Sequence, residues 1–300
     1  MAKMPMVEAN RLSKMLNLVY AGEDRFPVDI EALALEVSTQ RFPNEPIVKI
    51  SAIEIPGFEG VLARHPLQPK WKIGYNRNIQ SAGRIRFTLA HEFGHYLLHR
   101  ELKSNFQCTQ QNMHEWDGAE QDIEVAADVF ASYLLMPLDD FRRQLAGQAI
   151  SIDLLLHLGD RYGVSPMAAA LKWAEIERKR MVVVAVRDGH VLWARSSPSA
   201  FRSGVYLASR KRLIEVPSGS LLNTSLADDQ TRSGTQSARL WFDREGPDVA
   251  LTEHIHVSSG KYPYTLGLLV LPDAAPRWDE PDDELLSPLD LTPQSGSIRA

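Results

Sequence analysis

The run FTLAHEFGHYLLH, residues 87–99, most constrains what this chain can fold into, because it places ionisable side chains on an otherwise apolar helix. Its apolar spacing predicts one helix from Ile85 to about Arg100. The ionisable residues of the run are His91, Glu92, His95 and His99. Charged groups among apolar side chains are tolerated only when they have a partner. The run therefore predicts a buried site that these side chains serve.

The spacing of the first two histidines predicts a metal centre. His91 and His95 are four residues apart, so on a helix they lie on one face, about one turn from each other. Two imidazoles at this spacing can bind one Zn²⁺, and Glu92 can then act as general base on a water held by the ion. The alternative is an ordinary helix face with solvated histidines, which the apolar neighbours disfavour.

His99 continues the stripe by one more turn. At 1.5 Å per residue it lies about 12 Å from His91 along the helix axis. That separation is too long for both residues to bind the same ion. We therefore expect His99 to be a buried structural histidine.

A second helical segment, EVAADVFASYLLMP at 124–137, supplies the missing carboxylate. Glu124 and Asp128 are four residues apart, and two acidic groups on an apolar helix repel each other unless something binds them. Facing the first helix, Glu124 would complete a His₂Glu set with an open fourth position, and Asp128 would accept a hydrogen bond from a ligand histidine. Glu120 and Asp122 compete for the same role, and helical phase favours Glu124.

The two segments together resemble the ImmA/IrrE metallopeptidases. RIRFTLAHEFGHYLLH follows that family's F-x-x-A-H-E-x-G-H-x-x-x-H, and the second segment follows E-x-x-A-N-x-F-A-x-x-L-L-M-P, with Asp128 in place of asparagine. The resemblance covers about residues 10–175. It implies a zincin-like fold in which zinc is bound by His91, His95 and Glu124 and Glu92 is the general base.

The same resemblance implies a partner and a setting. The protein substrate would be a helix-turn-helix transcriptional repressor, cleaved in a DNA-damage, stress or phage-defence response. Mn²⁺ and Fe²⁺ are alternative ions, because a His₂Glu site accepts several first-row metals. An exposed strand at 71–76 (WKIGYN) is expected to bind an extended substrate segment by strand addition.

Cys108 is the single cysteine of the chain. One cysteine excludes an internal disulfide and fits a reducing compartment, so a cytoplasmic location is predicted. Cys108 lies in a polar stretch at 103–118 that is predicted to be a loop between the ligand helices. Its thiolate can occupy the open zinc position and inhibit the enzyme, with His114 as a weaker candidate. The alternative is an ordinary free thiol.

The fold class predicted for the chain is α+β. Before the H-E-x-x-H helix we expect helices near 6–20 and 28–37 and then two strands between 46 and 76. Four parts are predicted: a zincin-like metallopeptidase domain at 1–147, a helix-turn-helix-like segment at 148–180, a strand-rich domain at 181–275 and an acidic, disordered tail at 276–300.

The strand-rich part is predicted to be a sensor, GAF-like by resemblance, with single-stranded DNA as the candidate activator. Its basic cluster is Arg202, Arg210, Lys211 and Arg212, and its candidate stacking aromatics are Trp193, Tyr206 and Trp241. The alternative is an exposed charged turn beside core aromatics. A net charge of −5 argues against non-specific nucleic-acid binding by the whole surface.

Two functional classes follow from the sequence. The first is a zinc endopeptidase, and the alternative is a DNA-binding transcriptional regulator with a structural zinc site. Glu92 favours the first, because a structural site has no use for a base. No apolar run approaches the roughly 18 residues that span a bilayer, so no membrane partner is expected.

Overall fold

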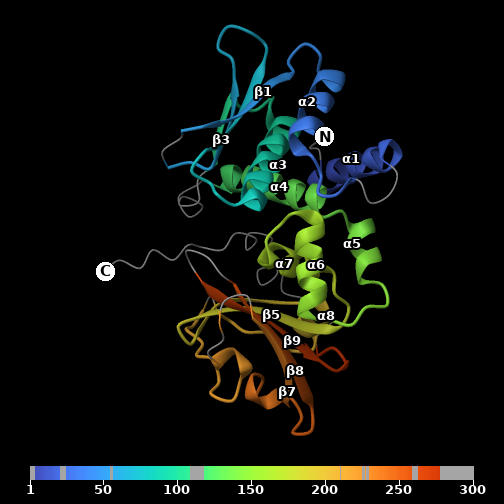
Figure 1. Ribbon diagram of the computed structural model, residues 1–300, viewed down its shortest axis with the longest axis vertical. Coiled ribbons are helices and arrows are strands. Elements are labelled where there is room, and N and C mark those ends of the chain that lie inside the picture. Colours follow the sequence, from blue (N-terminus) through green and yellow to red (C-terminus); the bar gives the residue numbers. More distant parts are fainter. Residues whose placement is uncertain are drawn as a thin grey trace. The chain divides into compact units, whose positions relative to one another are not determined.

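In a computed structural model, the chain forms two compact units (Figure 1). The described residues are 4–20, 25–54, 57–108, 118–209, 211–224, 227, 230–258 and 263–277, with the backbone alone for 107–108 and 118–120. Among the described residues, the first unit comprises those up to 146 together with 159–165, and the second comprises 147–158 and those from 166 to 277. Both units combine helices with a sheet. No helix in the described ranges has the length and apolar character to cross a membrane.

The sheet of the first unit has the strand order β1-β3-β2-β4. Its strands are β1 (Ile47–Ile53), β2 (Gly60–Arg64), β3 (Trp71–Asn76) and β4 (Asn105–Cys108). β3 runs parallel to β1 and antiparallel to β2, and β2 is antiparallel to β4. The prediction of two strands between 46 and 76 is wrong, since three form there. The prediction that 71–76 adds a substrate strand is also wrong, because β3 is already hydrogen-bonded on both sides.

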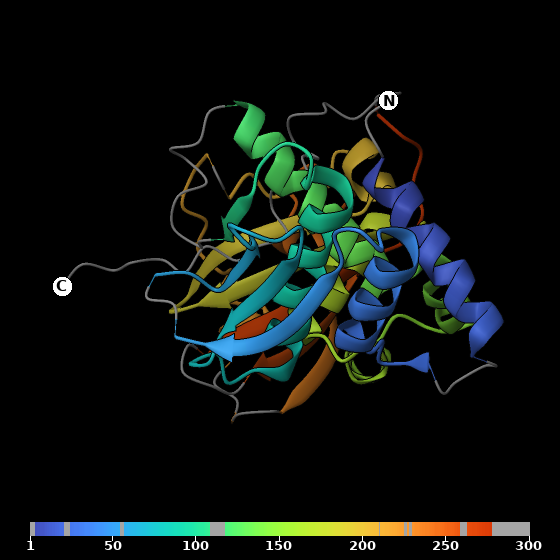
Figure 2. The same cartoon turned by 90° about the horizontal axis from the view of Figure 1, so that it is seen from above.

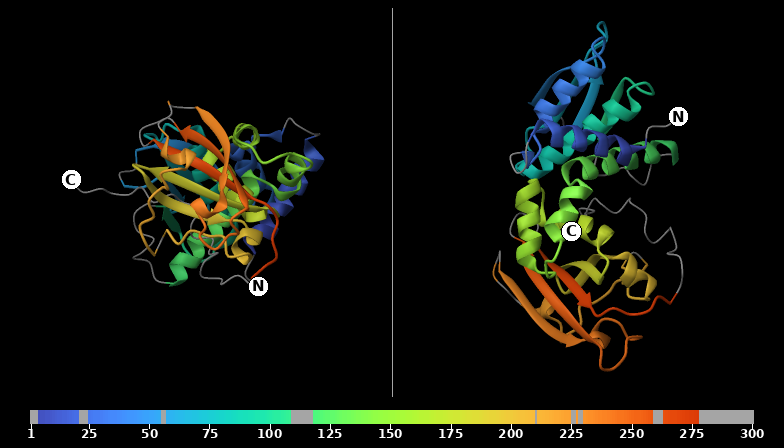
Figure 3. Two further views of the ribbon diagram at one scale, coloured as in Figure 1. Left: turned by 90° about the horizontal axis from the view of Figure 1, so that it is seen from below. Right: turned by 90° about the vertical axis from the view of Figure 1, so that its right-hand side faces the viewer.

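The helices of the first unit up to residue 146 are α1 (Pro5–Val19), α2 (Ile30–Arg41), α3 (Ala82–His99), α4 (Gly118–Leu135) and α5 (Leu138–Leu145). α3 packs on β2 and β3, and α2 packs on β1, beside which it lies in Figure 2. α4 packs on α3, and α1 packs on α4 (Figure 3, right). The two predicted ligand helices are therefore direct neighbours.

Local signals set the ends of the ligand helices. The Ser81 side chain accepts a hydrogen bond from the Arg84 amide, so α3 begins at Ala82, three residues before the predicted start. α4 ends at Leu135, just before Pro137, which cannot continue a helix. Its last described turns are almost wholly buried, which suits a central helix.

A buried carboxylate fastens α5 to the end of α6 (Ile152–Tyr162). Asp140 accepts hydrogen bonds from the Arg161 Nε and Nη2 atoms at 2.7 and 3.0 Å and from the Tyr162 hydroxyl at 2.8 Å. Burial alone would raise the pKa of Asp140, but these hydrogen bonds hold it below its usual value. The turn after α6 is held as well, since Arg86 of α3 donates to the carbonyl of Gly163.

The second unit is built on an antiparallel sheet with the order β6-β5-β9-β8-β7. Its strands are β5 (Arg180–Arg187), β6 (His190–Ser196), β7 (Thr231–Ser237), β8 (Ala250–Ser258) and β9 (Tyr264–Leu271). β5 and β6 form a hairpin whose turn is Asp188-Gly189, a dipeptide typical of such turns, with φ of 51° and 72° at these residues. α7 (Pro166–Ile176) and α8 (Pro198–Arg202) pack on β5 and β6.

Two segments of this unit have a structure that their composition does not indicate. The apolar run LWFD at 240–243 is not a strand, because Leu240 ends the 3-10 turn η3 (Ala238–Leu240), and Trp241 and Phe242, which follow it, belong to the core. β7 is polar along its length and carries no sequence signal of a buried strand. It forms because β8 offers an edge with which to pair.

Asp140→Asn is expected to lower the free energy of unfolding by about 3 kcal/mol, because the Arg161 guanidinium loses its charged partner in a mostly buried position. The native pKa of Asp140 is lowered, so its contribution is present above the usual pKa of a carboxyl and is lost as the pH falls. Urea unfolding at neutral and acidic pH measures both effects. The exposed neighbour Asp139→Asn is the control, and equal losses for the two variants would contradict the assignment.

Candidate metal centre

A glycine lets the two ligand helices approach closely. A Cβ built at Gly94 would lie 2.9 Å from Cδ1 of Phe130 and 3.4 Å from Cα of Ala127. α3 and α4 therefore touch almost backbone to backbone at this point. Glu124 is one turn before Ala127 on the same face, so the close approach brings its carboxylate to the histidines of α3.

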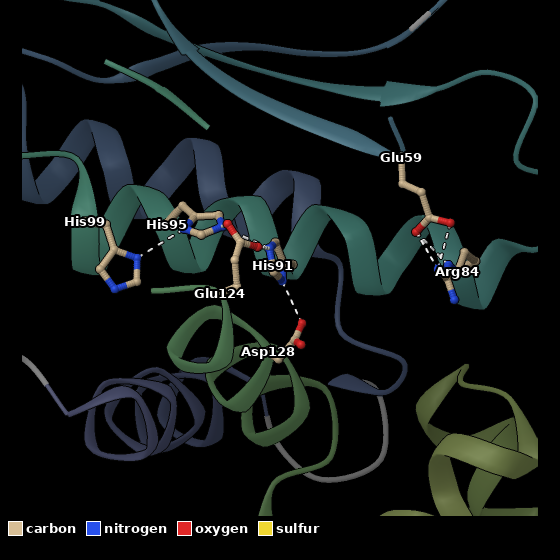
Figure 4. Close-up of polar contacts among 7 residues, drawn as sticks. All are labelled: Glu59, Arg84, His91, His95, His99, Glu124 and Asp128. Carbon is tan, nitrogen blue, oxygen red and sulfur yellow. Dashed lines mark hydrogen bonds and ion pairs between the residues drawn. The ribbon is translucent and has the colours of Figure 1, made fainter. Parts of the chain in front are cut away.

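Three side chains converge between these helices (Figure 4). The Nε2 atoms of His91 and His95 are 2.9 Å apart. Glu124 places Oε2 at 3.0 Å from Nε2 of His91 and Oε1 at 3.3 Å from Nε2 of His95. Two imidazole nitrogens and a carboxylate that meet at one point are the donor set of a His₂Glu site. The cluster can hold a metal ion, and it is the one such group of three within the described residues.

The outer nitrogens of both rings are also engaged. Nδ1 of His91 lies 2.8 Å from Oδ1 of Asp128, and Nδ1 of His95 lies 3.1 Å from Nδ1 of His99. Asp128 therefore occupies the place expected for a partner of a ligand histidine. His99 is buried and lies outside the convergent group.

Burial and charge tune the cluster for a cation. Burial would raise the pKa of Glu124, but its hydrogen bonds to His91 and His95 hold that pKa well below the usual value. Burial lowers the pKa of His95, and the hydrogen bond to Glu124 opposes this shift. An ionised carboxylate and neutral imidazoles are the forms that bind metal.

Glu92 differs from its neighbours, because within the described residues neither of its carboxylate oxygens has a hydrogen-bond partner. The side chain is 0 % exposed, and burial raises its pKa to about 8, an effect that His91 opposes and Glu124 reinforces. A buried polar group with no partner costs stability and is typical of a functional site.

A second glycine, Gly60, lets the backbone of the sheet lie directly against Glu92. A Cβ built at Gly60, the first residue of β2, would lie 2.5 Å from Oε1 of Glu92 and 2.6 Å from Cγ2 of Thr88. Arg84 fixes the preceding residue by donating from Nε and Nη2 to the carboxylate of Glu59 at 2.8 and 2.7 Å (Figure 4). The backbone of β2 thus stays beside the Glu92 carboxyl. Sequence reasoning missed this role of Gly60.

Phe106 is the other residue that sequence reasoning missed. The stretch from 103 was predicted to be a loop, but residues 105–108 form β4 and pair with β2. Phe106 is buried and stacks on the His95 ring, with centroids 4.6 Å apart and an interplanar angle of 16°. The signal was the single apolar residue in a short alternating run, N-F-Q-C, which is weak for so short a strand.

The other candidates of the first unit are placed as follows. Asp122 is exposed and lies outside the convergent group. Cys108 ends β4 with its backbone opposite Gly60, while its side chain lies outside the described residues. The side chain of Glu120 and the whole of His114 lie outside them too.

The basic cluster predicted in the second unit is only partly described. Arg202, Lys211 and Arg212 are exposed, and Arg210 lies outside the described residues. Of the candidate stacking aromatics, Tyr206 is exposed and Trp193 is half-buried.

Trp241 is not a stacking platform. It is buried, and its Nε1 atom donates to Glu253 Oε1 at 2.7 Å. The same carboxylate accepts from the Ser220 hydroxyl and the Leu221 amide. Trp241 is therefore a core residue that satisfies a buried acid.

Comparison with known families places this cluster in context. Residues 45–174 match the profile of the Peptidase M78 family, described as the IrrE N-terminal-like domain. The match runs from the start of the sheet through both predicted ligand helices and most of α7, so it includes most of the segment at 148–180 that was predicted to be helix-turn-helix-like. A search of curated proteins finds no match to the chain.

Gly94→Val is expected to lower the free energy of unfolding by about 1–3 kcal/mol, because its branched side chain must push Phe130 and α4 away. The same displacement withdraws Glu124, so the affinity for Zn²⁺ should also fall. Gly94→Ala is the matched comparison and should lose less stability, since its single Cβ lies 3.4 Å from the Ala127 backbone and only the Phe130 ring, at 2.9 Å, must shift. Denaturant unfolding and zinc titration measure both effects, and a valine variant as stable as wild type would contradict the close packing.

Glu92→Gln is expected to stabilise the metal-free protein, and increasingly so as the pH rises from about 4.5 to about 8. The native pKa is raised, so the unfolded chain ionises first and stability is lost across this interval. The gain at pH 8 is at most about 5 kcal/mol, taking about 1.4 kcal/mol per pH unit. Urea unfolding in a chelator measures it. Glu101→Gln, on an exposed side chain, is the control, and parallel curves for Glu92→Gln and wild type would contradict the burial.

Proposed function

Because residues 45–174 match the IrrE N-terminal-like domain of the M78 peptidase family, we propose that this chain is a zinc-dependent endopeptidase that cleaves a specific protein. The observation that carries the proposal is Glu92. It is fully buried beside a His₂Glu cluster, and neither of its oxygens has a hydrogen-bond partner among the described residues. A base kept without partners in that place is suited to receiving a proton during peptide hydrolysis.

The roles of the side chains follow from this geometry. His91, His95 and Glu124 would hold the ion, which supplies a Lewis acid that polarises the scissile carbonyl and acidifies water. Glu92 accepts a proton from the attacking water and passes it to the amine nitrogen as the peptide C–N bond breaks. Asp128 accepts the Nδ1–H of His91 and so keeps its Nε2 lone pair directed at the cluster.

The alternative is a DNA-binding regulator in which the ion is structural. Structural zinc sites are closed by four protein ligands, whereas three side chains converge here within the described residues. In this alternative Cys108 would be the fourth ligand. In the peptidase that we propose, its thiolate would instead inhibit the enzyme by binding the ion. The pairing of its backbone with Gly60, which lies against Glu92, supports that hypothesis.

The substrate we propose, from the resemblance, is a helix-turn-helix repressor that is cleaved in a DNA-damage, stress or phage-defence response. An extended segment of it can add to the sheet at β4 rather than β3. Among the described strands, β4 has a neighbour on one side only, and its Phe106 touches His95. Strand addition beside the cluster would place a peptide bond near Glu92.

The second unit is proposed to be a GAF-like sensor, with single-stranded DNA as the activator. The support is its antiparallel sheet and the exposed side chains of Arg202, Lys211, Arg212 and Tyr206. Cations along a path and an aromatic side chain are the elements that bind single strands. A cytoplasmic location, where such DNA and a repressor occur, is consistent with the single cysteine.

The decisive test mixes the protein with Zn²⁺ and a helix-turn-helix repressor encoded beside it, with and without single-stranded DNA. We expect cleavage by wild type and a loss of roughly 100-fold or more for Glu92→Gln, because the general base is removed. Mass spectrometry of the products identifies the scissile bond. Stoichiometric zinc binding with no cleavage under any condition would favour the structural-metal regulator.

Two variants separate the regulatory parts within the same assay. If the second unit senses DNA, Lys211→Gln with Arg212→Gln abolishes the stimulation and leaves the basal rate unchanged. Cleavage at the same rate with and without DNA would support the peptidase proposal and contradict the DNA-sensor proposal. If Cys108 inhibits, Cys108→Ser raises the basal rate, and an unchanged rate shows an ordinary thiol.

A further inference from the structure

Both histidines of the cluster have a partner at the ring nitrogen that faces away from it. For His91 the partner is the carboxylate of Asp128, 2.8 Å from Nδ1. For His95 it is Nδ1 of His99, 3.1 Å from Nδ1 of His95 (Figure 4). The two contacts occupy equivalent positions, but the first partner is an anion and the second is a neighbouring imidazole one turn along the same helix.

The direction of the hydrogen bond between His95 and His99 follows from which nitrogen of His95 faces the cluster. Nε2 of His95 lies 2.9 Å from Nε2 of His91 and 3.3 Å from Glu124, so this nitrogen faces the cluster. A nitrogen that binds a metal presents its lone pair, and the proton of the neutral ring is then on Nδ1. That N–H must find an acceptor, and Nδ1 of His99 is at hydrogen-bond distance.

We propose that His99 is a positioning residue for the metal centre, accepting the Nδ1–H of His95 and so fixing the tautomer and rotation of that ring. The inference rests on the proposed zinc binding. Phe106 restrains the same imidazole. Its ring stacks on the face of His95, while the hydrogen bond to His99 holds the edge of the His95 ring. The ring is thereby restrained against both tilt and rotation.

His99 is not a further ligand in this arrangement. Its Nδ1 atom points at the outer nitrogen of His95, and the convergent group contains His91, His95 and Glu124 only. The purely structural alternative is that the contact merely satisfies a buried histidine. The two readings differ in whether metal affinity depends on an acceptor at this atom.

A neutral acceptor also suits the charge of the site. A divalent cation would be balanced by Glu124 and Asp128, each 13 % exposed at the side chain. Another carboxylate at position 99 would add an uncompensated negative charge in a buried place. An imidazole orients His95 without that charge.

The test compares His99→Leu with His99→Asn. Both side chains have similar size and shape, but Asn carries an oxygen where His carries Nδ1, whereas Leu carries a methyl group. We expect His99→Leu to weaken Zn²⁺ binding by roughly 10–100-fold, the usual effect of losing an outer partner, and His99→Asn to restore most of it. Competition with a chromogenic chelator measures the dissociation constants. Equal affinities for the two variants would overturn the proposal.

NMR of the zinc-loaded wild type supplies a readout that does not depend on how the variants fold. With ¹⁵N-labelled histidine, the expected state is His95 with its proton on Nδ1 and a scalar coupling across the hydrogen bond to an unprotonated Nδ1 of His99. A proton found on Nδ1 of His99 would overturn the proposal. Tight zinc binding with the expected proton pattern but no proteolysis would support the role of His99 and contradict the proposed peptidase activity. Absence of zinc binding by wild type would contradict both proposals.

Discussion

The close packing of α3 on α4 is the contact on which the rest of the site depends. Gly94 and Ala127 allow the two backbones to approach, and Glu124, one turn away, then reaches both histidines. A larger residue at the crossing would push α4, and with it the Glu124 carboxylate, away from the histidines. Packing and the position of the Glu124 carboxylate are therefore coupled at this crossing.

Three buried carboxylates of this chain differ in their hydrogen-bond partners. Asp140 is bound by Arg161 and Tyr162, and Glu253 accepts from two side chains and one backbone amide. Each of these acids ties elements together. Glu92 is buried as deeply, yet no described group donates to it, and its pKa rises to about 8. This carboxyl without a described partner lies beside the His₂Glu cluster, where the proposed mechanism uses a proton acceptor.

The sheet contributes more to the centre than support. β2 brings the backbone of Gly60 against Glu92, and β4 brings the ring of Phe106 against His95. The Arg84–Glu59 ion pair fastens the start of β2 to the first turn of the ligand helix. Helix and sheet thus enclose the same group of side chains from opposite sides, and a substrate strand at β4 would lie next to both.

The sequence by itself determined the ligand helices and their side chains, because the four-residue spacings of His91/His95 and Glu124/Asp128 are local properties of a helix. The D-G hairpin and the helix end before Pro137 were determined in the same local way. Only the tertiary structure decided which strand is central, that Phe106 and Gly60 line the site, that Trp241 belongs to the core, and that His99 meets His95. These features depend on which segments pair and pack across long sequence separations, and no local spacing encodes that choice.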